Sequence, residues 1–141
     1  MFKKILLAVD GSEDSKQASK VTGELARRNH AEVIVVHAFP PVPNYLGDPQ
    51  QEEMIKDFTS AGREIAQEAA DAVEGDDVEV VTEVLAGSPA ETILEVAKTR
   101  QPDLIVMGSR GQGDLSSLLL GSVSHRVLAH AKPPVLVVKA K

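Results

Sequence analysis

The sequence contains no cysteine and no tryptophan, and only 3% of its 141 residues are aromatic. Without cysteine the chain forms no disulfide and has neither a thiolate nucleophile nor a cysteine-ligated metal site. The scarcity of aromatic rings argues against a surface on which nucleic-acid bases stack. Acidic residues outnumber basic ones by 21 to 15, and the net charge of −6 disfavours nucleic acid and anionic membranes as partners.

Long hydrophobic runs are also missing. The N-terminal segment MFKKILLAVD holds a short apolar run, but Asp10 and Gly11 end that run before a signal-peptide core or a membrane span is complete. We therefore expect a cytoplasmic protein. The composition, 43% apolar and 26% charged, is typical of a globular chain, and no linker-like segment divides it, so we expect one domain over residues 1–141.

Short apolar runs alternate with segments of helical periodicity along the chain. The apolar runs predict strands at 4–9, 31–39, 78–85, 102–108 and 133–139. Helical spacing, with Met54, Phe58 and Ile65 on one face of the second segment, predicts helices at 13–29, about 51–74, 88–100 and 122–131. Ser12 is expected to cap the first helix, and the Ser88, Pro89 and Glu91 spacing predicts a capping box on the third. The proline-rich segment 40–49 predicts a surface loop.

This alternation predicts an α/β fold with an open sheet of five parallel strands and helices on both faces. The strand at 78–85 mixes polar and apolar residues, which places it at an edge. We expect the strand order 3-2-1-4-5, in which the direction of winding reverses between the first and fourth strands. Ligands of such sheets bind beyond the carboxyl ends of the strands at that reversal. The two strands concerned end in VDGS and MGSRGQG.

A glycine motif follows the fourth strand. Gly108, Gly111, Gly121 and Ser122 match the pattern G-x2-G-x9-G-[S/T], which begins at the end of a predicted strand and finishes at the start of a predicted helix. Glycine lets an anion approach the backbone, and unpaired N–H groups at a helix start attract negative charge. We expect Ser122 and Ser124 to add hydroxyl donors, Arg110 to add charge, and the intervening DLSSLLL to pack the loop down through its leucines.

The same residues also allow other interpretations. The motif is neither a Walker P-loop, because it lacks the lysine, nor the dinucleotide fingerprint, because its glycines run G-x-x-G-x-G. The glycines alone also suit a tight turn and a helix junction. Ser122 with His125 suggests a nucleophile and its base, but no G-x-S-x-G elbow is present. The four histidines lie in separate elements, so we expect no metal site made by the protein alone.

The chain resembles the nucleotide-binding branch of the universal stress protein family. The resemblance is carried over the whole chain by KILLAVDGSEDS, VIVVHAF, GSPAETILEVAKTRQPDLIVMGSRGQG and LLGSVSHRVLAHAKPPVLVVK. It implies the five-stranded parallel α/β fold predicted above, of the Rossmann-like adenine nucleotide alpha hydrolase type. It also implies that the glycine motif binds the phosphates and ribose of ATP.

The resemblance assigns a role to individual residues. Asp10 would bind the ribose hydroxyls, the backbone near Ala38 would meet the adenine edge, and Gly108 would lie beside the ribose. The phosphates would be held by the second half of the motif, with Mg²⁺ or Mn²⁺ bridging phosphate oxygens: Gly111, Gly121, Ser122, Val123 and Ser124. Ala8, Met107 and Arg110 complete the expected nucleotide-binding set.

The last strand predicts a partner. An apolar strand at a sheet edge invites pairing with another chain, and the resemblance likewise implies a homodimer through Val135–Val138. Taken together, we expect an ATP-binding stress-response regulator with little or no hydrolysis, since no Walker lysine organises the phosphates for transfer. Two alternatives stay open: a slow ATPase or autokinase, and a nucleotide-free protein-interaction module.

Overall fold

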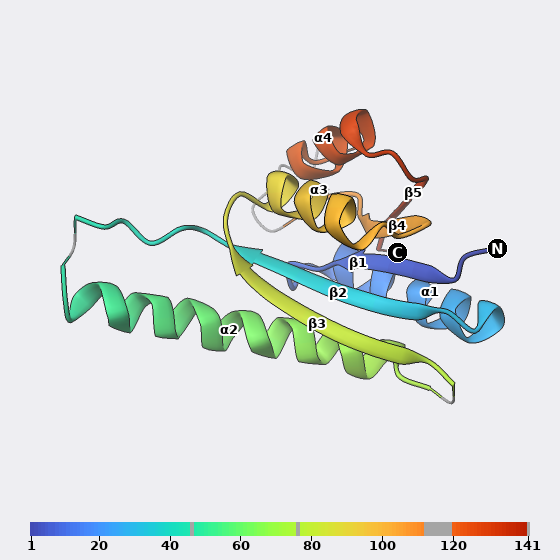
Figure 1. The fold of residues 1–141 in the computed structure, drawn as a ribbon, viewed down its shortest axis with the longest axis horizontal. Coiled ribbons are helices and arrows are strands. Elements are labelled where there is room, and N and C mark those ends of the chain that lie inside the picture. The colour runs from blue at the N-terminus through green and yellow to red at the C-terminus, as the bar shows by residue number, and fades with distance from the viewer. Residues whose placement is uncertain (46, 76, 112–119, 141) are drawn as a thin grey trace.

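Strands and helices alternate throughout the computed structural model, which describes residues 1–45, 47–75, 77–111 and 120–140 (Figure 1). The alternation predicted from the sequence is confirmed. The strands are β1 (Lys4–Ala8), β2 (Glu32–Phe39), β3 (Glu79–Ala86), β4 (Leu104–Gly108) and β5 (Val135–Val138). The helices are α1 (Glu13–Asn29), α2 (Gln50–Val73), α3 (Pro89–Arg100) and α4 (Ser122–His130).

The strands form one parallel sheet in the order β3-β2-β1-β4-β5. This is the predicted order, and β3 occupies the predicted edge. At the centre, Leu6 of β1 lies in register with Ile34 of β2 and with Ile105 of β4. Because β1 is followed by β2 on one side and flanked by β4 on the other, the winding reverses beside β1. The carboxyl ends of β1 and β4 therefore face a common crevice.

Each face of the sheet is covered by two helices. In Figure 1, α1 and α2 lie below the sheet, while α3 and α4 lie above it. The central strands bury apolar side chains on both faces, as parallel strands covered by helices do. One core layer contains Ile5, Leu7, Val33, Val35 and Val106, and the other contains Leu6, Ile34, Val36, Ile105 and Val127.

Helix α2 begins well beyond the sheet. Figure 1 shows its first turns, and the chain that leads to them, extending past the carboxyl end of β2. The spacing that places Met54 on one face of α2 with Phe58 and Ile65 does not bury it, since Met54 is 37% exposed. Phe58 does contact the sheet, and its ring centroid lies 5.9 Å from that of Phe39 in β2. In the described part of the chain, no helix combines the length and apolarity needed to cross a membrane.

The starts of α1 and α3 differ from each other. Ser12 caps α1 as predicted, with its Oγ accepting a hydrogen bond of 3.2 Å from the Ser15 N–H. Ser88 occupies the cap position of α3, but its side chain makes no capping hydrogen bond within the described structure. The predicted capping box is therefore wrong. Its partner Glu91 instead forms an ion pair with Arg126, which links α3 to α4.

We predict that the two cap serines contribute unequally to stability. Ser12→Ala should lower the free energy of unfolding by about 1 kcal/mol, because it removes a capping bond. Ser88→Ala should change it by less than about 0.5 kcal/mol, since no capping bond is lost. Urea denaturation of the two variants beside the wild type checks this difference, and equal losses would contradict it.

Candidate functional site

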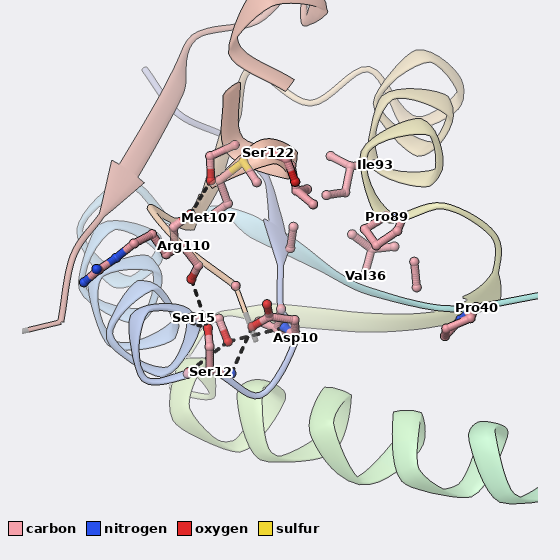
Figure 2. A pocket seen from close by; sticks show the side chains of 17 residues that line it. Asp10, Ser12, Ser15, Val36, Pro40, Pro89, Ile93, Met107, Arg110 and Ser122 are labelled. Atoms are coloured by element: carbon pink, nitrogen blue, oxygen red, sulfur yellow. Dashed lines mark hydrogen bonds between the residues drawn. The ribbon is translucent and has the colours of Figure 1, made fainter. Parts of the chain in front are cut away.

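A cavity of about 390 Å³ opens at the carboxyl ends of β1, β2 and β4 (Figure 2). The first turns of α1, α3 and α4 close its sides. Val36, Pro89, Ile93 and Met107 form an apolar part of the wall, and Asp10, Ser12, Ser15 and Ser122 contribute polar groups. It lies where the winding of the sheet reverses, which is the location predicted from the strand order.

All of the predicted nucleotide-binding residues except Gly121 line this cavity: Ala8, Asp10, Ala38, Met107, Gly108, Arg110, Gly111, Ser122, Val123 and Ser124. Gly121 directly precedes Ser122 in the chain, and its N–H donates to the Ser109 carbonyl at 2.6 Å. Residues 112–119, which include Gly113 and most of the DLSSLLL segment, lie outside the described residues. Segments far apart in the sequence thus meet around one space.

Asp10 is held by the turn that joins β1 to α1. Its Oδ1 accepts a hydrogen bond of 2.9 Å from the Ser12 N–H, and its own N–H donates to Ser15 Oγ at 3.3 Å. Gly11 between them adopts a positive φ of 83°, which glycine reaches without steric cost. In Figure 2 the side chain of Asp10 lies close to Ser12. The turn therefore presents a carboxylate of defined orientation.

The opposite wall of the cavity is the start of α4. Gly121 is the cap residue of this helix, with φ −74° and ψ 166°, and no side chain in the described structure caps it. The first helical hydrogen bond is that from the His125 N–H to the Gly121 carbonyl, so the N–H groups of residues 122–124 precede the helical ladder. These N–H groups give the site a partial positive charge.

The two serines of this turn differ. Ser122 is exposed at the cavity, and it is the first helical residue instead of the cap. Ser124 is 2% exposed, and its hydroxyl donates to the Gly108 carbonyl at 2.7 Å. The hydroxyl of Ser124 therefore joins α4 to the end of β4. Of the polar groups of Ser124, only the backbone N–H belongs to the set of N–H groups at the start of α4.

Gly108 is required by packing. A Cβ atom at this position would lie 2.7 Å from Asp14 Cβ and 2.9 Å from the Ser15 nitrogen. Such distances are shorter than any van der Waals contact, so only glycine lets the first turn of α1 approach the end of β4 this closely. The first glycine of the motif is thus explained by the fold itself as well as by the cavity.

Asp14 organises this approach, and it is not among the site residues predicted from the sequence. It is 6% exposed. Its Oδ2 accepts from Ser109 Oγ at 2.5 Å and from the Arg110 N–H at 3.1 Å, while its Oδ1 accepts from the Ala140 N–H at 2.8 Å. The donors are distant in sequence, so no local pattern marked them.

The guanidinium of Arg110 turns toward Asp14, with Nε 4.0 Å from Oδ2. Figure 2 shows the side chain pointing away from Asp10 and across α1. Arg110 was expected to bring a positive charge to the phosphates, but in the structure its guanidinium lies beside Asp14. The residue borders the cavity while its charged end lies by α1.

Burial raises the pKa of the Asp14 carboxyl. The hydrogen bonds from Ser109, Ala140 and Arg110, together with the charge of Arg110, lower it by more than burial raises it. The net effect places its pKa below the ordinary value of 3.8. The ionised carboxylate is thus the form that the folded protein stabilises, because all of its partners are donors.

The hydrolase alternative finds no support in the geometry. Ser122 and His125 are both exposed on α4, and no hydrogen bond joins them within the described structure. Among the described residues, no group of three or more histidine or acidic side chains is placed to hold a metal ion.

An open parallel sheet with helices on both faces and a glycine-bordered cavity at its winding reversal defines a Rossmann-like α/β protein. The chain belongs to the universal stress protein family, whose sequence model matches residues 1–139.

Individual relatives agree with this assignment. A universal stress protein of Thermus aquaticus is 46% identical over 139 residues, covering 99% of this chain and 100% of the relative. The solved structure of the hypothetical protein MJ0577 is 30% identical, with a TM-score of 0.89 over 100% of this chain and 98% of the other. A universal stress protein solved in complex with cAMP is 25% identical, with a TM-score of 0.71 over 99% and 98%.

We predict that Asp14→Asn lowers the free energy of unfolding by about 2 kcal/mol at pH 7, because the amide cannot accept all of the converging donors. Since the folded pKa lies below the unfolded one, the ionised carboxylate stabilises the fold above the unfolded pKa, and this contribution is lost as the pH falls through the folded pKa.

The difference between wild type and Asp14→Asn should therefore be constant near neutrality and shrink below about pH 4. Urea denaturation of both proteins from about pH 2.5 to about pH 7 measures this difference in the free energy of unfolding. A difference that stays the same in acid would contradict the assignment.

Proposed function

We propose that this chain binds an adenine nucleotide, ATP in the first place, in the cavity at the ends of β1, β2 and β4. In this proposal it acts in the cytoplasm as a nucleotide-dependent stress-response regulator with little or no hydrolysis. The observation that carries the proposal is the uncapped start of α4 facing the cavity opposite Asp10. A volume of about 390 Å³ suits a small-molecule ligand.

The start of α4 is the proposed phosphate site. The N–H groups of Ser122, Val123 and Ser124 precede the helical ladder, and the exposed hydroxyl of Ser122 lies beside them. Donors of this kind, aligned with the helix dipole, bind phosphate oxygens without needing a cationic side chain. Gly111 and Gly121 carry no Cβ, so no side chain of either residue stands between the phosphates and the start of α4.

The other end of the cavity suits a nucleoside. Asp10 is oriented by the β1–α1 turn, and a carboxylate has the lone pairs to accept hydrogen bonds from ribose hydroxyls. Val36, Ile93 and Met107 offer apolar contacts for a flat base, and Ala38 offers backbone groups. Gly108 brings the ribose close to β4. The neighbour that was solved with cAMP supports this choice of ligand class.

Mg²⁺ or Mn²⁺ would be held chiefly by phosphate oxygens. Asp14, the carboxylate nearest the motif, accepts bonds from Ser109, Arg110 and Ala140 and so is engaged within the protein. A bridging cation would neutralise phosphate charge. Slow turnover is proposed because the sequence carries no Walker lysine beside the phosphates and because the only charged residues among those described as lining the cavity are Asp10 and Arg110.

We predict that the purified protein carries or binds ATP and that Gly121→Val weakens this binding at least tenfold, or by about 1.4 kcal/mol. A valine side chain at the cap of α4 would stand where phosphate oxygens approach the N–H groups. Acid extraction with chromatography identifies a retained nucleotide, and calorimetry measures affinity for ATP with Mg²⁺. Ser88→Ala, at the start of α3, serves as a control that keeps the wild-type affinity.

Phosphate release followed over hours distinguishes the alternatives. We expect the wild type to release no more phosphate than Gly121→Val. Turnover by the wild type alone would favour the slow ATPase, and a radiolabel on the protein would favour the autokinase. A wild type that neither retains nor binds adenine nucleotide would overturn the proposal and leave the nucleotide-free interaction module.

We further propose a homodimer through β5. This strand forms the sheet edge, and Leu136 is 37% exposed. The carbonyls of Pro134 and Val138 accept from the N–H groups of Ile105 in β4 and of Ser109 just after it. The alternating residues Val135 and Val137 therefore direct their backbone groups to the open edge. An apolar edge with free backbone groups is satisfied when a second copy pairs with it.

We predict that Val137→Pro converts the dimer to a monomer, because proline removes an outward N–H while the bonds to β4 remain. Thr82→Pro is the matched control: it lies at an outward position of β3, on the opposite edge, and should leave the dimer intact. Light scattering after size-exclusion chromatography gives the mass. A wild type of one-chain mass, 15.0 kDa, or a dimeric Val137→Pro would contradict the interface.

A further inference from the structure

We propose that His37 is a positioning residue that keeps the backbone edge of Ala38 open for the base and thereby sets a preference for adenine over guanine. The inference rests on the proposed nucleotide site and concerns a residue that lies behind it. Two observations carry it: the contact of His37 Nδ1 with the Val9 carbonyl at 2.8 Å, and the point at which the ladder between β1 and β2 ends.

The ladder between β1 and β2 ends one step before Ala38. Its last bond is donated by the Val9 N–H to the Val36 carbonyl at 3.0 Å. On the other side of β2, the Phe39 carbonyl accepts from the Gly87 N–H at 2.8 Å, so Phe39 faces β3. Because backbone groups of successive strand residues point to alternate sides, the N–H and carbonyl of Ala38 face the side of β1.

Regular continuation of a parallel ladder would place the Ala38 N–H on the Val9 carbonyl. The structure places His37 Nδ1 there instead, and since the partner is a carbonyl, the imidazole nitrogen is the donor. Within the described residues, no backbone bond joins Ala38 to Val9. Both residues line the cavity. The N–H and the carbonyl of Ala38 are therefore directed into the cavity.

Helix α2 holds the imidazole in this position. His37 is 8% exposed, on the face of the sheet that α2 covers. A Cβ atom on Gly62 of α2 would lie 2.9 Å from His37 Cδ2 and 2.7 Å from Val84 Cγ1. The helix thus rests on the ring because residue 62 is glycine. Helix α2 therefore packs closely against the ring on the side of Cδ2.

An N–H and a carbonyl side by side on a strand edge match adenine and mismatch guanine. The Watson–Crick edge of adenine offers an acceptor at N1 and a donor at the 6-amino group, whereas guanine offers a donor at N1 and an acceptor at O6. Backbone groups cannot exchange their roles. Guanine at this position would oppose donor to donor and acceptor to acceptor, which costs affinity because the buried groups stay unpaired.

Two substitutions separate the hydrogen bond from the packing. His37→Phe keeps a ring but removes the donor, so the Val9 carbonyl becomes available to the Ala38 N–H. His37→Asn loses the ring but keeps an amide donor close to the position of Nδ1. We expect wild type to prefer ATP to GTP, and His37→Phe to lose about tenfold of that preference through weaker ATP binding. His37→Asn should keep it.

Calorimetry with ATP, GTP and inorganic tripolyphosphate gives the readout, with thermal melting as a check of folding. Tripolyphosphate affinity should be the same in all three proteins, because the start of α4 is unchanged. An ATP-to-GTP ratio that His37→Phe leaves intact would overturn the proposal. So would a ratio lost equally in both variants, which would make the role one of packing.

Amide exchange in the wild type provides a test that needs no variant. The Ala38 amide should exchange rapidly in the nucleotide-free protein and become protected when ATP is added. Strong protection without nucleotide would refute the open edge. If the wild type binds tripolyphosphate but binds ATP and GTP equally well, the role of His37 is overturned while phosphate binding stands. Failure to bind any of the three would overturn the nucleotide site as well.

Discussion

The carboxylate of Asp14 connects the start of α1 to the segments that follow β4 and β5, and the placement of the other site residues depends on this connection. It lies in the first turn of α1 and accepts hydrogen bonds from Ser109 and Arg110 after β4 and from Ala140 after β5. Backbone donors have fixed positions, so a buried acceptor shared between them sets the relative placement of all three segments. Gly108 makes the contact possible, since any side chain there would meet the backbone of α1.

The cavity follows from this arrangement. Once the starts of α1 and α4 and the end of β4 are held together, a carboxylate lies at one end and an uncapped helix start at the other, with apolar side chains between them. On the far side, His37 makes a similar buried polar contact with Val9. Buried hydrogen bonds of Asp14 and His37 thus hold the cavity walls from behind.

The fold was predictable because each level of the sequence pointed to the same answer. Apolar strands covered on both faces, a polar edge strand and turn residues at strand ends specify a parallel sheet whose order follows from short right-handed connections. The errors arose where a local pattern was taken as sufficient. Met54 has helical spacing but lies beyond the sheet, and Glu91 has capping-box spacing but pairs with Arg126 on another helix.

What the sequence by itself determined was the order of elements, the strand order and the place where glycines and Asp10 would gather, because periodicity and turn chemistry are local properties. The tertiary structure alone decided which groups in that place are already engaged. Ser124 and Arg110 were expected to serve the phosphates, yet the hydroxyl of Ser124 donates to Gly108 and the guanidinium of Arg110 lies by Asp14. The contacts of Asp14 and His37 carry no local signature, since their partners are distant in sequence and are brought close only by folding.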